Sequence, residues 1–212
     1  MRYQSQRRSF LKYTLAASAA LFAIGQTTAF ADQAAEDFVQ GILDEAEPIL
    51  DAPTQQELLD GVENLVAQYV DMRRIGRFVL GQYARQMTDA QAEEYFPLFQ
   101  QYATIIYQNT LSDYEGQRIV VTGSVDRSER DIIVNSKLAN PEPGAAFANA
   151  VIHWRVYRDR DGNMSVVDAG ADNVWLAIEQ RSQFTSLIAN NGGGAAGIDA
   201  LIAEIRSRVN ED

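Results

Sequence analysis

His153 is the only histidine of the chain, and it limits the chemistry that the sequence can support. A histidine metal cluster needs several such residues, and the chain has no cysteine to supply thiolate ligands. A serine hydrolase triad would have to use His153 as its base, but no Gly-x-Ser-x-Gly elbow is present. Between Ile152 and Trp154 on an expected strand, His153 is more typical of a structural residue than of a general base.

Two other segments resemble functional motifs, but their spacing favours structure. The glycine-rich run Gly192–Gly197 follows an expected helix rather than a strand, and no lysine comes after it, so a phosphate-binding loop is not indicated. The turn Asp159–Asn163 lacks the spacing of a calcium loop and predicts a hairpin connection. A carboxylate pair for glycoside hydrolysis stays open, because no pair stands out among the 29 acidic residues.

The elements that would hold such residues begin with helices. Apolar residues at helical spacing predict helices at 35–50, from Thr54 onwards, at 71–86 and from Thr88 to about 111. Thr54 and Thr88 each stand three positions before Glu57 and Gln91, a spacing that is typical of capping boxes at helix starts. The helical part therefore covers about 33–112.

The periodicity then changes from helical to alternating. Strands are predicted at 118–126, 131–139, 150–157 and 164–169, which form a four-stranded antiparallel meander over about 117–170. Helical periodicity returns at Val174, stops at the glycines and resumes from Ile198, so C-terminal helices cover about 174–209. The predicted fold is α+β, with a curved four-stranded antiparallel sheet packed against an N-terminal helical bundle and C-terminal helices.

The first 31 residues have the pattern of an export signal. Arg7 and Arg8 precede a short apolar stretch, and Ala29-Phe30-Ala31 offers small residues for a signal peptidase. The apolar stretch is shorter than the roughly 18–20 residues of a membrane anchor. We expect twin-arginine export to the periplasm and cleavage after Ala31, which leaves residues 32–212 as a single α+β domain.

The charge of the chain limits its partners. The whole sequence has a net charge of −11, and residues 32–212 hold 14 basic and 29 acidic side chains, a net charge of −15. Nucleic acid is an improbable partner because a polyanion needs clustered cations. An anionic lipid surface would also repel this chain, so membrane contact is expected through partner proteins.

Aromatic residues are dense in the helix that follows Thr88. Tyr95, Phe96, Phe99, Tyr102 and Tyr107 all lie within it. Such residues fill a core or line a cavity, and periodicity alone does not separate these two interpretations.

Several runs resemble the MlaC family of periplasmic phospholipid carriers, also called the toluene-tolerance auxiliary family. These runs are Arg73-Arg74-Ile75-Gly76-Arg77-Phe78-Val79-Leu80-Gly81-Gln82-Tyr83, Tyr95-Phe96-Pro97-Leu98-Phe99 and Arg181-Ser182-Gln183-Phe184. The resemblance implies a carrier that is not an enzyme, needs no cofactor and holds phospholipid as cargo in a deep apolar pocket. It also implies two partners: an inner-membrane ABC transporter complex with an MCE-type substrate-binding component, and an outer-membrane lipoprotein complex.

The burial of acyl chains sets the kind of pocket to expect. Each buried methylene contributes about 0.8 kcal/mol, so a carrier that competes with a bilayer must enclose most of the chain. From periodicity and the resemblance, the predicted lipid-binding residues are Phe78, Val79, Tyr83, Phe99, Ile106, Tyr107, Leu111, Val121, Ile133, Val134, Ile152, Trp154, Val174 and Phe184. The arginines Arg73, Arg77 and Arg181 are candidates for head-group phosphates or partner acids, although solvated ion pairs are the commoner role.

Two alternative functions remain at this point. A periplasmic hydrolase would use His153 or a carboxylate pair, and an acidic adaptor would contact only other envelope proteins.

Overall fold

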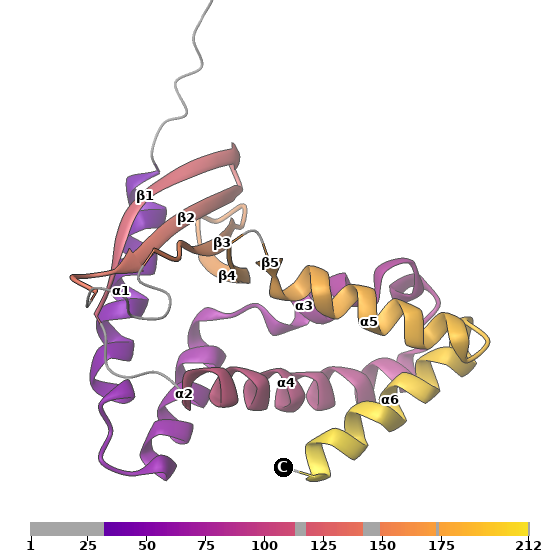
Figure 1. Cartoon of the computed structure of the whole chain (residues 1–212). Coiled ribbons are helices and arrows are strands. Elements are labelled where there is room, and N and C mark those ends of the chain that lie inside the picture. The colour runs from indigo at the N-terminus through magenta and orange to yellow at the C-terminus, as the bar shows by residue number, and fades with distance from the viewer. Residues whose placement is uncertain (1–31, 113–117, 142–148, 173, 212) are drawn as a thin grey trace, which may run out of the picture.

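The computed structural model describes residues 32–112, 118–141, 149–172 and 174–211, with the backbone alone at 109–112. The chain begins with helices and ends with helices, and a sheet lies between them (Figure 1). The first group comprises α1 (Gln33–Leu50), α2 (Gln55–Tyr69), α3 (Met72–Val79), the 3-10 helix η1 (Gly81–Arg85) and α4 (Asp89–Ser112). The last group comprises α5 (Leu176–Asn190) and α6 (Gly194–Glu211). This order confirms the predicted α+β fold.

Side-chain caps fix the starts of α2 and α4. The Thr54 hydroxyl accepts the N–H of Glu57 at 3.2 Å. At α4 the capping box is complete: Thr88 Oγ1 accepts the N–H of Gln91 at 3.2 Å, and Gln91 Oε1 accepts the N–H of Thr88 at 3.1 Å. Both predicted helix starts are confirmed.

The third predicted helix is split in two. Helix α3 ends at Val79, and Gly81 has a φ of +56°, in the left-handed region that glycine adopts readily. An α-helix requires negative φ at every residue, so the chain cannot continue straight through this position. The prediction of one helix over 71–86 was wrong for this reason.

The sheet is antiparallel throughout, with the strand order β1-β2-β3-β4-β5. Its strands are β1 (Ile119–Ser128), β2 (Asp131–Leu138), β3 (Ile152–Arg158), β4 (Met164–Ala171) and β5 (Val174–Trp175). The four predicted strands are confirmed, and β5 is a correction, because the segment from Val174 was expected to be helical. Gly170 pairs with Trp175, and a Cβ at Gly170 would overlap the carbonyl oxygen of Val174, so a residue without a side chain permits this tight return.

One face of the sheet packs on α1. Ile132, Val134 and Val156 are fully buried there against Ala35 and Val39. The residues between them point to the other face, which is more polar. On that face Arg155 donates from Nε and Nη2 to the two carboxylate oxygens of Asp131 at 2.8 and 2.9 Å.

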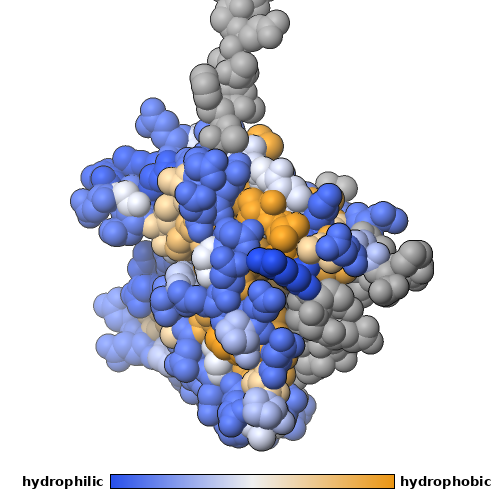
Figure 2. All heavy atoms as spheres, turned by 90° about the vertical axis from the view of Figure 1, so that its left-hand side faces the viewer, coloured by the Kyte–Doolittle hydropathy of each residue, from blue (hydrophilic) through white to orange (hydrophobic). Residues whose placement is uncertain are grey.

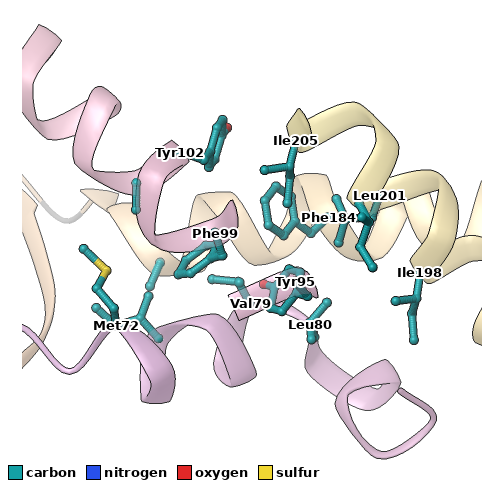
Figure 3. Packing of buried hydrophobic residues seen from close by; sticks show 14 of the residues in the cluster. Met72, Val79, Leu80, Tyr95, Phe99, Tyr102, Phe184, Ile198, Leu201 and Ile205 are labelled. Carbon is teal, nitrogen blue, oxygen red and sulfur yellow. The ribbon is translucent and has the colours of Figure 1, made fainter. Parts of the chain in front are cut away.

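A second, larger core lies among the helices beyond the sheet. Figure 3 shows Tyr95 and Phe99 of α4 beside Phe184 of α5. Leu201 and Ile205 of α6 belong to the same core. The ring centroids of Tyr95 and Phe99 are 5.6 Å apart, and those of Phe99 and Phe184 are 6.2 Å apart, both within the range of favourable aromatic pairs. This core holds α4, α5 and α6 together beside α3 (Figure 1).

The exterior is mainly hydrophilic on the face shown in Figure 2, where hydrophobic residues are visible between hydrophilic ones. None of the helices in the described residues is both long enough and apolar enough to span a bilayer.

Candidate functional site

A cavity of about 270 Å³ lies between α3, α4 and α5. Its wall is mostly apolar, with polar side chains contributed by α5. The lining residues are Ile75, Val79, Phe99, Tyr102, Ala103, Ile106, Tyr107, Leu176, Ala177, Glu179, Gln180 and Gln183. Leu176 is 40 % exposed, and Glu179 and Gln183 are also exposed, so the cavity opens to solvent along α5.

Helix α4 supplies one continuous side of this wall. Phe99 is followed three and four residues later by Tyr102 and Ala103, and Ala103 three and four residues later by Ile106 and Tyr107, which puts all five on the same face of a helix. The aromatic face that the sequence indicated is therefore partly core and partly cavity wall.

The end of strand β4 positions the first turn of α5. Asp168 is 3 % exposed, and its Oδ1 accepts the N–H of Ala177 at 2.9 Å and that of Ala169 at 2.9 Å. Since Ala177 lines the cavity, this carboxylate fixes part of the wall.

Burial affects the titration of two groups at this junction. Desolvation raises the pKa of Asp168, although its hydrogen bonds to Ala177 and Ala169 and the charge of Arg155 act against this rise. Burial, together with the negative charge of Asp168, raises the pKa of Tyr107 to about 12.

A chain of hydrogen bonds crosses from α6 through α4 to α5. Arg208 Nη1 donates to the Tyr102 hydroxyl at 3.4 Å, and that hydroxyl donates to Gln180 Oε1 at 3.3 Å. Gln180 Nε2 is buried and has no hydrogen-bond partner among the described residues. Tyr102 and Gln180 both line the cavity.

A second cavity of about 200 Å³ adjoins the first. It is lined by Tyr102, Gln183, Phe184, Leu187, Glu204, Ile205 and Arg208. Tyr102 and Gln183 belong to both walls, so these two side chains separate the cavities.

The helices bring together part of the predicted lipid-binding set. Val79, Phe99, Ile106 and Tyr107 line the larger cavity, and Phe184 lines the smaller one. Phe78 and Tyr83 belong to the same helical core without lining either cavity. The side chain of Leu111 lies outside the described residues.

The predicted sheet residues lie elsewhere. Val121, Val134 and Trp154 pack on the α1 side of the sheet, and Ile152 shares that face because it pairs with Ser136 in register with them. Ile133 lies on the opposite face, and Val174 is 54 % exposed on β5. The larger cavity therefore lies among helices rather than between α4 and the sheet, and lipid contact at the sheet residues remains a prediction.

Several lining residues were not among the predicted ones. Ile75, Tyr102 and Ala103 could have been found, since they share helix faces with Val79 and Phe99 at intervals of three or four residues. The sequence did not indicate that Gln180 and Gln183 line a cavity, because a glutamine on an amphipathic helix is usually interpreted as a solvent-exposed residue.

The three candidate arginines lie over aromatic rings. The guanidinium carbons of Arg73 and Arg77 are 4.4 and 5.9 Å from the ring centroid of Phe96, and that of Arg181 is 4.9 Å from the ring centroid of Phe78. All three arginines are exposed, so they give an otherwise acidic molecule a cationic surface beside α3.

Comparison with known proteins decides between the remaining interpretations. The family model described as MlaC protein matches residues 33–207. The chain belongs to the MlaC family. This membership confirms the resemblance. MlaC proteins are lipid carriers without enzymatic activity, so the hydrolase is removed from consideration.

A solved structure shares the fold of this MlaC chain. It is described as the phospholipid-binding protein from Ralstonia solanacearum in complex with a phospholipid. The match has a TM-score of 0.68 and 21 % sequence identity, and it covers 84 % of this chain and 97 % of the other. The two proteins therefore have the same overall architecture despite their low identity.

The imidazole of His153 lies against two neighbouring side chains. His153 Nδ1 lies 2.7 Å from Asn135 Oδ1, and the ring stacks on Trp175 with centroids 5.7 Å apart. Both contacts hold the imidazole within the sheet. The described residues contain no group of three or more histidines, cysteines or acids that could hold a metal ion.

MlaC proteins are periplasmic, so the predicted compartment is confirmed. The residues of the expected signal, 1–31, lie outside the described part of the chain.

Proposed function

We propose that this protein carries phospholipid across the periplasm and holds acyl chains in the cavity among α3, α4 and α5. The observation that supports this most directly is the apolar wall that α4 presents there, from Phe99 to Tyr107. Ligand pockets commonly occupy about 300–1,000 Å³. The larger cavity alone, at about 270 Å³, falls just below this range, and joined with the neighbouring cavity of about 200 Å³ it falls within it.

The size of the cavity has a mechanical consequence. An acyl chain of about fifteen carbons gains about 12 kcal/mol on full burial, at about 0.8 kcal/mol per methylene. To collect most of that free energy, the wall between the two cavities must move so that one chain can extend through both. Tyr102 and Gln183 form this wall, and Gln183 is exposed on α5, so we expect α5 to shift away from α4 as lipid enters.

The partners that we propose follow from the family. They are an inner-membrane ABC transporter complex with an MCE-type component and an outer-membrane lipoprotein complex. The cationic surface formed by Arg73, Arg77 and Arg181 would suit an acidic patch on such a partner, because the rest of the chain would repel it.

We also propose that residues 1–31 direct export by the twin-arginine route and are removed after Ala31, which leaves a single domain over 32–212. Replacement of Arg7 and Arg8 by lysine should block export, and the mature protein should begin at Asp32 in N-terminal sequencing. Export of the double variant at the normal level would contradict the proposed route.

Mass spectrometry of organic extracts tests the carrier function. The purified protein should release phospholipid in a fixed ratio to protein. Ala103 lines the cavity and is 7 % exposed, so Ala103→Phe should fill much of the space and lower the lipid yield severalfold. Ala90→Phe, at an exposed position on the same helix, is the matched control and should keep its lipid. Lipid-free wild-type protein that takes up no phospholipid from vesicles would instead favour the adaptor.

A further inference from the structure

Gln180 stands out among the cavity residues because its amide nitrogen is buried without an acceptor. Nearly all buried donors in folded proteins are hydrogen-bonded, since an unpaired donor loses its contact with water and gains nothing in return. Gln180 lines a cavity that we propose to hold lipid. An acceptor oxygen of a ligand would give Gln180 Nε2 the hydrogen-bond partner that it lacks.

The hydrogen-bond chain from α6 ends on the oxygen of the Gln180 amide. Arg208 is a pure donor, so the Tyr102 hydroxyl accepts from it, and the hydroxyl proton is directed to Gln180 Oε1. Gln180 therefore presents Oε1 to Tyr102, and Nε2 is the group left over.

On this basis we infer that Gln180 donates a hydrogen bond to an oxygen of the bound phospholipid, either an ester carbonyl at the glycerol or a phosphate oxygen. The inference rests on the proposed carrier function and adds a polar subsite to it. The rest of the wall is mostly apolar, and residues such as Phe99 and Ile106 select hydrocarbon without fixing its position. Gln180 would set how deep the chains enter, because it ties the polar end of the lipid to one point on α5.

The position of Gln180 agrees with this role. It follows Leu176 and Ala177 by one turn on α5 and precedes Gln183, so it lies along the helix at which the cavity meets solvent. A lipid whose tails point toward α3 and α4 would leave its glycerol and head group along α5. The polar glycerol linkage of the lipid would then lie next to the polar side chain of Gln180.

The test is a binding comparison with soluble short-chain lipids on delipidated protein, read by displacement of a fluorescent phospholipid. Gln180→Leu removes the donor and keeps a side chain of similar length. We expect it to bind short-chain diacyl phosphatidylcholine about five- to tenfold more weakly than the wild type, as the loss of one buried hydrogen bond predicts. Gln101→Leu, at an exposed glutamine of α4 that lines neither of the two cavities, is the matched control and should change affinity less than twofold.

Two further lipids identify the acceptor. If it is an ester carbonyl, Gln180→Leu should bind the dialkyl ether analogue as well as the wild type does, and should lose affinity for diacylglycerol. If the acceptor is a phosphate oxygen, the loss should persist with the ether analogue and vanish with diacylglycerol. Tyr102→Phe should weaken binding to a smaller extent, because it cuts the chain before Gln180.

The outcomes separate the two proposals. Wild-type protein that binds none of the phospholipids overturns the carrier function, and the subsite with it. Wild-type protein that binds them while Gln180→Leu binds equally well, or while Gln101→Leu loses as much, overturns the subsite alone. Circular dichroism and melting curves of the variants show that each compared protein is folded.

Discussion

Asp168 Oδ1 accepts the N–H of Ala177 at 2.9 Å, so a residue of β4 caps the helix that forms one side of the cavity. Asp168→Ala should lower the free energy of unfolding by about 1–2 kcal/mol, the usual cost of a lost helix cap. Urea denaturation measures this change. Unchanged stability would show that α5 is held by its packing alone.

The same carboxyl group predicts a pH dependence. Burial raises the pKa of Asp168 in the folded protein, so its contribution to stability is present when it is protonated and is lost as pH rises through the folded pKa. Asp168→Asn keeps an acceptor for Ala177 and does not titrate. Relative to the wild type, it should therefore gain stability as pH rises from about 4 to 7. Urea denaturation of both proteins across this range measures the difference, and a constant difference would contradict the assignment.

The Asp131–Arg155 pair predicts the opposite dependence. Hydrogen bonds from Arg155 lower the pKa of Asp131, so this pair stabilises the fold above the unfolded pKa and the stability is lost as pH falls. The two side chains are 23 % and 29 % exposed, which leaves an expected loss of about 1–2 kcal/mol for Asp131→Asn at pH 7. The loss should shrink below about pH 4. Asp126→Asn, at an exposed position on β1, serves as the control for a change of one charge.

Val79 and Val134 form a matched pair for locating the lipid. Both are 0 % exposed, but Val79 lines the cavity and Val134 packs against α1. Replacement of either by alanine should cost about 1–2 kcal/mol in unfolding free energy. Val79→Ala should in addition change the acyl-chain lengths of the co-purified lipid, while Val134→Ala should leave them unchanged. A changed lipid profile in Val134→Ala would instead support the sheet contacts predicted from the sequence.

Replacement of glycine by alanine should have opposite effects on stability at Gly41 and at Gly197. A Cβ at Gly41 meets no atom within 4 Å, so Gly41→Ala should stabilise α1 by about 0.5–1 kcal/mol. A Cβ at Gly197 would overlap the carbonyl oxygen of Ile188, where α6 crosses α5. Gly197→Ala should destabilise the protein by about 1–3 kcal/mol, as overpacking does. Thermal melts of both variants check the sign, and a stabilised Gly197→Ala would mean that the two helices can separate without cost.

The candidate site was predictable on one of its sides. The face of α4 from Phe99 to Tyr107 follows from helical spacing, because large apolar residues repeat there every three or four positions. The polar wall on α5 was not predictable. A helix-periodic glutamine such as Gln180 has the same local pattern whether it faces solvent or a cavity, and its neighbours Tyr102 and Arg208 come from distant parts of the chain.

The sequence by itself determined most of the elements, their order and the starts of α2 and α4, since periodicity and caps such as Thr88 with Gln91 are set by residues a few positions apart. It also determined the acidic charge and, through family-specific runs, the class of protein. The tertiary structure decided which segments each face of the sheet and of the helices packs against. Val134 and Trp154 pack on the side of the sheet that faces α1, and the cavity lies among the helices. Which face of a sheet is covered depends on contacts between segments far apart in the chain, and a local sequence pattern does not encode these contacts.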